Sequence, residues 1–207
     1  MALLSEHNLE KLKTNYNLST FFETGTGLFE GLNHALGFGW DHVFSCDLIY
    51  DTVMSARTEF KGRAKILRGK SWDCVRCFLR MREADPESYG NVLWWLDAHF
   101  PGVDTGDLTF EQSGNSYPAD GLPLCEELQA IADYVCDKDV ILVDDAFLYR
   151  ANVSEVNPFG RVPPDLHERA LGSVESVLFR FRDTHDLTVQ RTETGSFILK
   201  PKCITNS

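Results

Sequence analysis

Acidic residues end four short apolar runs of this sequence. They are Glu23, Asp47, Asp97 and the neighbouring pair Asp144 and Asp145. Carboxylates accept hydrogen bonds from hydroxyl and ammonium groups, and they are the ligands that hard divalent cations prefer. A single acid at such a position is explained by a turn or a helix cap, where Asp is common. Five acids that all end apolar runs instead indicate one polar site, if the runs are neighbouring strands.

Glu23 also begins a glycine turn, with the sequence Glu23-Thr24-Gly25-Thr26-Gly27. An apolar run over 19–22 precedes this turn, and a helical pattern over 28–36 follows it. A strand, a glycine turn and a helix N-terminus let the backbone approach a ligand and point free N–H groups at it. The dinucleotide fingerprint G-x-G-x-x-G is absent here, because Glu30 occupies its third glycine position.

The elements that must position these residues alternate between strand and helix. We predict helices over 5–17, 28–36, 50–60, 71–81, 124–136 and 165–182, strands over 19–22, 42–46, 64–67, 92–96 and 140–143, and a hairpin of strands 187–192 and 196–200. Ser5 and Ser71 are the expected N-caps of two of these helices. Near-continuous apolar strands that alternate with helices are typical of a buried parallel sheet, in which ligands bind at the carboxyl ends of the strands. We therefore expect one α/β domain over 1–207, with residues 1–18 as an N-terminal helical extension.

Composition excludes several classes of partner. The chain of 207 residues has a formal net charge of −11 and a pI of about 4.9, which argues against a broad nucleic-acid or anionic-membrane surface. The N-terminus lacks the pattern of a signal peptide, and no apolar run reaches membrane-spanning length. The six cysteines are scattered, and the pair Cys74 and Cys77 has no second ligand pair for zinc. These features predict a cytoplasmic protein with reduced thiols.

The ordered set of E-x-G-x-G, the acid Asp47 after the second strand and the terminal hairpin resembles the class I S-adenosylmethionine-dependent methyltransferases. The resemblance covers about residues 19–200. It implies a Rossmann-like, doubly wound, seven-stranded sheet in three αβα layers, mostly parallel with an antiparallel C-terminal strand. It also implies S-adenosylmethionine as the cofactor.

By that resemblance, the residues of the glycine turn contact the cofactor: Glu23, Thr24, Gly25, Thr26 and Gly27. The two glycines would lie against its methionine part, and Asp47 would accept hydrogen bonds from both ribose hydroxyls. Glu23 and Asp97 would face the methionine amino group.

One position departs from the family. Many members have Gly-Asp after the third strand, and the acid meets the adenine amino group, whereas this chain has Gly69-Lys70-Ser71-Trp72. Lysine cannot accept that hydrogen bond. Ser71, Trp72 or the backbone would hold the adenine instead.

The acids after the fourth and fifth strands resemble, in part, the metal-dependent O-methyltransferase branch. That match implies a divalent cation, Mg²⁺ or Mn²⁺, held by Asp97, His99, Asp144 and Asp145, with Asp97 and His99 as catalytic candidates. Such a cation lowers the pKa of a substrate hydroxyl and orients it. For His99 a ligand and an ordinary loop residue remain equal alternatives.

The expected function is S-adenosylmethionine-dependent methyl transfer to a hydroxyl of a small molecule, such as a sugar or a natural-product intermediate, with or without metal. The alternatives are a metal-dependent enzyme of another class on the same fold and a non-catalytic binding module. We expect a small-molecule acceptor and no nucleic-acid or membrane partner, and a homo-oligomer stays open. The long polar segment 100–120 is predicted to be a lid over the acceptor.

Overall fold

The computed structural model describes residues 4–98, 123–134, 136–144, 174–190 and 195–202 of the chain. His99, Asp145, the predicted lid over 100–120 and the first part of the predicted helix 165–182 lie outside these ranges. The strands are β1 Leu18–Thr24, β2 His42–Asp47, β3 Lys65–Arg68, β4 Asn91–Leu96, β5 Val140–Val143, β6 His185–Gln190 and β7 Ser196–Pro201. The α-helices are α1 Leu9–Tyr16, α2 Glu30–Ala35, α3 Tyr50–Glu59, α4 Ser71–Ala84, α5 Pro86–Tyr89 and α7 Leu124–Ala132, and residues 174–178 are also helical. Short 3₁₀ segments are η1 Leu4–Glu6, η2 Leu36–Phe38 and η5 Phe179–Phe181.

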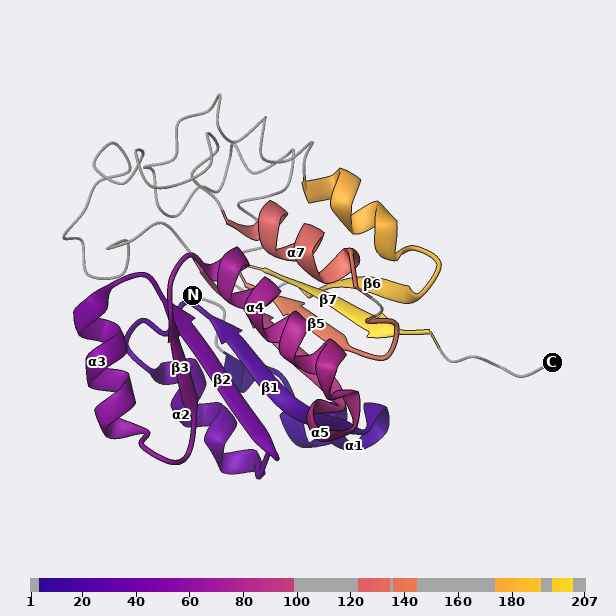
Figure 1. Cartoon of the computed structure of the whole chain (residues 1–207). Coiled ribbons are helices and arrows are strands. Elements are labelled where there is room, and N and C mark those ends of the chain that lie inside the picture. The colour runs from indigo at the N-terminus through magenta and orange to yellow at the C-terminus, as the bar shows by residue number, and fades with distance from the viewer. Residues whose placement is uncertain (1–3, 99–122, 135, 145–173, 191–194, 203–207) are drawn as a thin grey trace.

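These strands form one seven-stranded sheet in the order β3-β2-β1-β4-β5-β7-β6 (Figure 1). β1 lies at the switch point of the order, since it pairs in parallel with both β2 and β4. β7 runs antiparallel to β5 and to β6. The predicted Rossmann-like sheet with an antiparallel C-terminal strand is therefore confirmed, and the acids that end β1, β2 and β4 share one edge.

Helices cover both faces of the sheet, which makes three layers (Figure 1). One face packs against α4, α7 and the helical residues 174–178 through side chains such as Phe22, Trp94 and Phe78. The other packs against α1, α2 and α3, with Phe21 and Trp95 among its buried residues. Neighbours in one strand face opposite layers because side chains alternate along a strand, so Trp94 and Trp95 belong to different cores. The continuous apolar strands of the sequence arise from this burial on both faces.

Several predicted boundaries were wrong. The first helix does not start at Ser5: residues 4–6 form the 3₁₀ segment η1, and α1 begins after Asn8, whose Oδ1 accepts a hydrogen bond from Lys11 N at 2.9 Å. Ser71 does not cap α4, because the cap position is Lys70, which makes no side-chain capping bond. Helix α7 ends at Ala132, short of the predicted residue 136.

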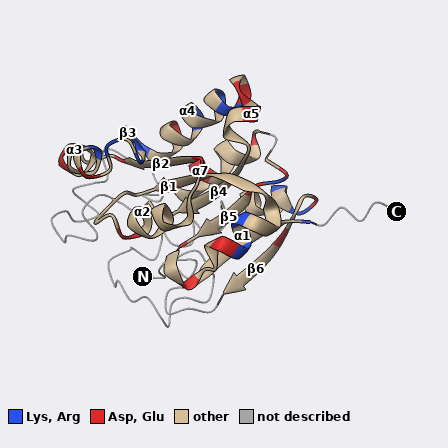
Figure 2. Cartoon of the chain, turned by 90° about the horizontal axis from the view of Figure 1, so that it is seen from below, with Lys and Arg blue, Asp and Glu red and all other residues tan. Residues whose placement is uncertain are grey.

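Among the described residues, no helix combines the length and apolar character that crossing a membrane requires. Basic and acidic segments are interspersed on the helices, including α1 (Figure 2).

Candidate functional site

The end of β2 holds the glycine turn in place. Gly25 N and Thr26 N both donate to the carbonyl oxygen of Cys46, at 2.9 and 3.1 Å. Gly27 N donates to Asp47 Oδ2 at 3.1 Å. The N–H groups of the turn are therefore already bound within the protein. This corrects the expectation that the turn offers them to a ligand.

What the glycines supply is space. Gly25 has φ +79°, and a Cβ on it would lie 2.7 Å from the carbonyl oxygen of Asp97. A side chain at Gly25 would therefore be strained and would displace the end of β4. Gly31, in the first turn of α2, has a similar role, since a Cβ there would collide with Glu23 Oε1. Gly31 was missed in the sequence, although a glycine early in a helix that follows a strand is a signal of close packing.

A small pocket of about 80 Å³ opens at this point, and we call it the glycine-turn pocket. Its lining residues are Glu23, Gly25, Thr26, Gly27, Leu28, Glu30, Gly31 and Asp97. The fold thus brings the turn after β1 together with the acid after β4, as the predicted sheet requires. Asp47, Ser71, Trp72 and Asp144 lie outside this lining.

Glu23 is a buried carboxyl in the wall of the pocket, with 1% of its surface exposed. Burial raises the pKa of Glu23 to about 8, the hydrogen bond from Ser45 opposes that shift, and the charge of Asp47 adds to it. Ser45 Oγ donates to Glu23 Oε2 at 2.6 Å and lies 2.7 Å from Thr26 Oγ1. Ser45 was not predicted, because it lies in the middle of β2 and meets Glu23 only through strand pairing. At neutral pH the carboxyl is mostly protonated, and a nearby cation would favour its ionised form.

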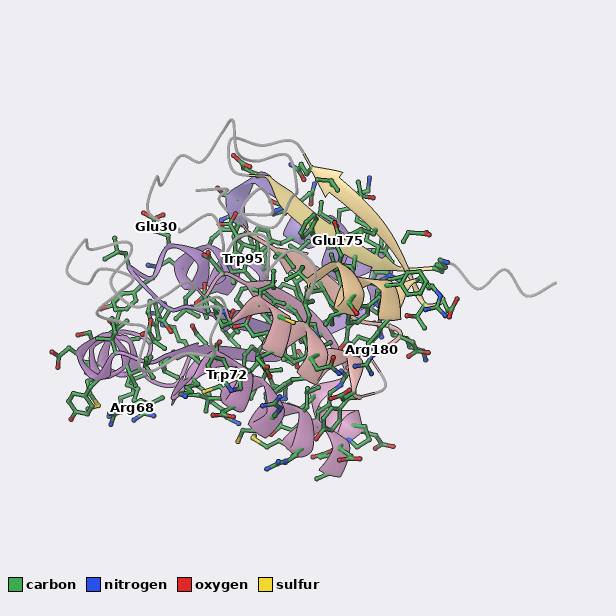
Figure 3. All side chains as sticks on the ribbon, turned by 90° about the horizontal axis from the view of Figure 1, so that it is seen from above. Glu30, Arg68, Trp72, Trp95, Glu175 and Arg180 are labelled. Carbon is green, nitrogen blue, oxygen red and sulfur yellow. The ribbon has the colours of Figure 1, made fainter. Side chains whose placement is uncertain are left out.

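The end of β4 is fixed by Thr24 and Trp95. Asp97 N and Ala98 N both donate to Thr24 Oγ1, at 3.1 and 3.3 Å. Asp97 Oδ2 accepts a hydrogen bond from Trp95 Nε1 at 3.2 Å. Figure 3 shows Trp95 near the centre of the molecule and Trp72 on the side of α4. Thr24 is thus a positioning residue for the β4 acid.

Asp47 organises the backbone around it. Its Oδ1 accepts from Ile49 N at 2.8 Å, and its Oδ2 accepts from Gly27 N. A carboxylate has about four acceptor positions, so the side chain keeps capacity for two further donors such as ribose hydroxyls.

The segment after β3 has Lys70 where many methyltransferases of this class have an acid. The Lys70 ammonium lies 5.2 Å from the centre of the Trp72 ring. Trp72 is only 7% exposed, so a base could stack on it only if neighbouring groups moved. Ser71 Oγ is buried, and in the described part of the chain it has no hydrogen-bond partner, which leaves it available to a ligand.

The structure describes two of the four predicted metal ligands, Asp97 and Asp144. Leu96 pairs with Val143, so Asp97 and Asp144 follow neighbouring strands at the same level of the sheet. Asp144 is buried, and its N–H donates to the carbonyl oxygen of Leu96 at 3.0 Å. His99 and Asp145 lie outside the described residues. The described residues contain no cluster of three or more side chains that could hold a metal ion. The metal centre therefore stays a prediction.

Comparison with known proteins identifies the fold. No family model and no curated protein matches the sequence. Among solved structures, the chain is similar to a methyltransferase from Podospora anserina with bound S-adenosylhomocysteine, at a TM-score of 0.54 and 12% identity over 94% of this chain and 76% of that one. It is similar to an O-methyltransferase from Bacillus cereus in complex with S-adenosylhomocysteine, at a TM-score of 0.52 and 15% identity over 94% and 79%.

A spermidine synthase in complex with a transition-state analogue also matches, at a TM-score of 0.52 and 14% identity over 91% of this chain and 56% of that one. The chain therefore has the Rossmann-like fold of class I methyltransferases. Since one fold serves different reactions, function must be argued from the site.

Proposed function

We propose that this protein is an S-adenosylmethionine-dependent methyltransferase that acts on a hydroxyl of a small molecule, as one domain over residues 1–207. The observation that carries the proposal is the glycine-turn pocket, where a backbone turn at the switch point meets the buried Glu23 in β1 and the half-buried Asp97 directly after β4. Ligands of such sheets bind at this position. The O-methyltransferase from Bacillus cereus, which has the same fold, contains S-adenosylhomocysteine.

The described residues fit the cofactor. The absence of a side chain at Gly25 lets the turn pack against the backbone of Asp97, which brings the turn and the acid after β4 together at the pocket. Glu23 and Asp97 supply carboxyl oxygens for an ammonium group, and Asp47 supplies acceptors for two ribose hydroxyls. Ser71 Oγ would contact the adenine in place of the acid that many family members have. When bound, S-adenosylmethionine supplies a methyl group on a positively charged sulfur.

The residues of this chain would then bind and orient the ligand. The carboxyl of Glu23, held by Ser45, would lose its proton when an ammonium group binds beside it. Asp97, fixed by Thr24 and Trp95, would hold the same end of the ligand at the end of β4. Orientation of the reacting groups is a large part of such catalysis.

A divalent cation, Mg²⁺ or Mn²⁺, is the second part of the proposal. Asp97 and Asp144 supply carboxylates from neighbouring strands, and Asp145 and His99 would complete the ligand set. The chemistry of this donor set suits a hard cation, which would polarise the acceptor hydroxyl.

The test is calorimetry with S-adenosylmethionine on the parent protein and on Asp47→Ala. We expect the exchange to weaken binding by about 1–3 kcal/mol, the loss typical of hydrogen bonds to a charged group. Asp51→Ala, which removes an exposed acid in the first turn of α3, is the matched control and should leave affinity unchanged. Equal affinity in all three proteins, with the fold intact by circular dichroism, would remove Asp47 from the site.

The same titrations distinguish the alternatives. Binding of Mn²⁺ without any binding of S-adenosylmethionine would support a metal-dependent enzyme of another class. Cofactor binding without methyl transfer to any member of a panel of hydroxylated small molecules would favour a non-catalytic module.

A further inference from the structure

A second pocket, of about 190 Å³, lies between α1 and the C-terminal hairpin, away from the glycine turn. We call it the α1–β7 pocket. Its lining residues are Glu6, His7, Asn8, Lys11, Leu12, Asn15, Tyr16, Gln190, Ile198 and Lys200. It shares no residue with the lining of the glycine-turn pocket. Nothing in the proposed methyl transfer uses it.

Strand alternation builds one wall of this pocket. Ile198 and Lys200 are two residues apart in β7, so their side chains lie on the same face of the sheet. Ile198 belongs to the core that α1 covers, which places Lys200 toward α1 as well. Leu12 and Ile198 supply apolar surface, and the amides of Asn15 and Gln190 supply polar groups. The lining therefore combines a small apolar surface with a larger number of polar groups.

Two lysines line this pocket, and among the described residues neither forms an ion pair, although Asp186 lies opposite Lys200 in β6. Neither Lys11 nor Lys200 forms an ion pair or a side-chain hydrogen bond with any described residue, although the chain carries a net charge of −11. Glu6 is the acid in the lining. The lining itself holds two lysines and one carboxylate, and Asp186 lies on the same face of the hairpin opposite Lys200.

A buried imidazole completes the site. His7 is 6% exposed, and its Nε2 is buried with no hydrogen-bond partner among the described residues. Burial, together with the nearby charge of Lys200, lowers the pKa of His7 to about 4, so the ring is neutral at pH 7. A neutral imidazole has one N–H to donate. A buried polar atom without a partner is costly, and a ligand that accepts its hydrogen bond would remove that cost.

We propose that the α1–β7 pocket binds a small molecule through a carboxylate or phosphate group, with Lys200 and Lys11 pairing with its charge and His7 donating a hydrogen bond. The apolar surface of Leu12 and Ile198 receives the body of that molecule. The site is separate from the cofactor site. One chain of contacts joins the two: His7 packs edge-to-face on Trp95 at 5.8 Å between ring centres, and Trp95 Nε1 donates to Asp97.

The test is a titration of the full chain, followed by amide NMR spectra, with inorganic phosphate and with acetate at constant ionic strength. We expect saturable shifts at the amides of Lys11, Gln190 and Lys200 with one or both anions. A response to phosphate alone would assign a phosphorylated ligand, and a response to acetate alone would assign a carboxylate.

Two variants and a control give the decisive comparison. Lys200→Gln should weaken anion binding about tenfold, the loss expected for a charge-assisted hydrogen bond. Lys61→Gln removes an exposed lysine outside the pocket and should change affinity less than about twofold, since a distant surface charge is screened. His7→Phe keeps the ring packing on Trp95 and should also weaken binding.

The proposal is overturned if neither anion produces saturable shifts at these residues. It is also overturned if Lys200→Gln and Lys61→Gln weaken binding equally, because the effect would then be general electrostatics. His7 is buried, so the His7→Phe result counts only if the NMR spectrum of that variant is that of a folded protein. If it is not, the comparison of Lys200→Gln with Lys61→Gln decides the question.

Discussion

At the scale of single residues, Glu23 is the clearest link between the structure and the proposed function. Burial and the charge of Asp47 make ionisation of the Glu23 carboxyl unfavourable, which raises its pKa to about 8. The hydrogen bond from Ser45 holds the side chain at the pocket without removing the cost. Such a carboxyl suits a site for a cationic group, because the charge of the ligand would compensate the cost of ionising the buried side chain.

Glu23→Gln should make the free protein more stable at alkaline pH. The pKa of Glu23 is about 8 in the folded protein and 4.5 in its ordinary state, so the folded protein holds more protons between these values. The free energy of unfolding therefore falls as pH rises from 4.5 to 8. The variant lacks this titration, so at pH 8 its free energy of unfolding should exceed that of the parent by about 4 kcal/mol. Urea unfolding at pH 5 and pH 8 measures the difference.

Titration of the histidines does not affect the difference in stability between the parent and Glu23→Gln. Burial lowers the pKa of His7 and of His185, so their contribution to stability is lost only as pH falls below 6.5, and it is shared by parent and variant. Glu10→Gln, an exposed acid on α1, is the control and should follow the parent. If parent and Glu23→Gln show the same pH dependence, Glu23 is ionised in the folded protein and our account of it fails.

At the scale of elements, one buried ion pair joins α4 to the start of β5. Arg82 Nη1 and Nη2 donate to the two carboxylate oxygens of Asp139 at 2.6 and 2.8 Å, with side chains 14% and 0% exposed. The same carboxylate accepts from Val92 N and from Trp94 Nε1, both at 3.0 Å. Asp139 therefore holds a helix and the beginning of β4 in register with β5, which sets the level at which the acids at the other end of these strands meet.

Asp139→Asn should destabilise the protein by about 3–5 kcal/mol, because it leaves Arg82 buried without a counter-charge. Asp133→Asn is the matched control: Asp133 pairs with Arg180 at 2.8 Å, but the side chains are 51% and 39% exposed. That exchange should cost less than about 1 kcal/mol. Thermal or urea unfolding of the two variants measures both losses of stability. Equal losses would show that burial of the Arg82–Asp139 pair does not increase its contribution to stability.

At the scale of the whole molecule, the order of the strands decides which acids can act together. Asp97 and Asp144 are far apart in the sequence and become neighbours only because β4 pairs with β5. Two carboxylates at the same level of adjacent strands repel each other unless a cation or a base compensates. This arrangement is the physical motivation for the metal prediction.

Asp144→Asn should reduce Mn²⁺ affinity at least tenfold, since it removes one charged ligand while keeping the shape of the side chain. Titration calorimetry on chelator-treated protein measures this, with Asp186→Asn, an exposed acid in β6, as the control. If the chelator-treated parent binds no Mn²⁺, or if Asp144→Asn binds it as the parent does, the acids at these strand ends are structural.

The sequence by itself determined the class of fold and the place of the candidate site. Apolar strands alternating with helices predicted the parallel sheet, and Glu23-Thr24-Gly25-Thr26-Gly27 marked its first strand–helix turn. These features are local, because each depends on residues that are close in the chain. Helix boundaries were less predictable: Asn8 rather than Ser5 caps α1, since both residue types are good caps and packing chose between them.

Only the tertiary structure decided how the residues of the candidate site are arranged. Pairing of β1 with β2 brings Ser45 to Glu23, and packing of α2 on β1 requires Gly31, and neither contact follows from sequence spacing. The same pairing binds the N–H groups of the glycine turn to Cys46 and Asp47, where the sequence had predicted free donors. The raised pKa of Glu23 likewise results from its burial, which cannot be read from the residue type alone. Local patterns specify elements, whereas the chemistry of a site depends on which elements the fold places side by side.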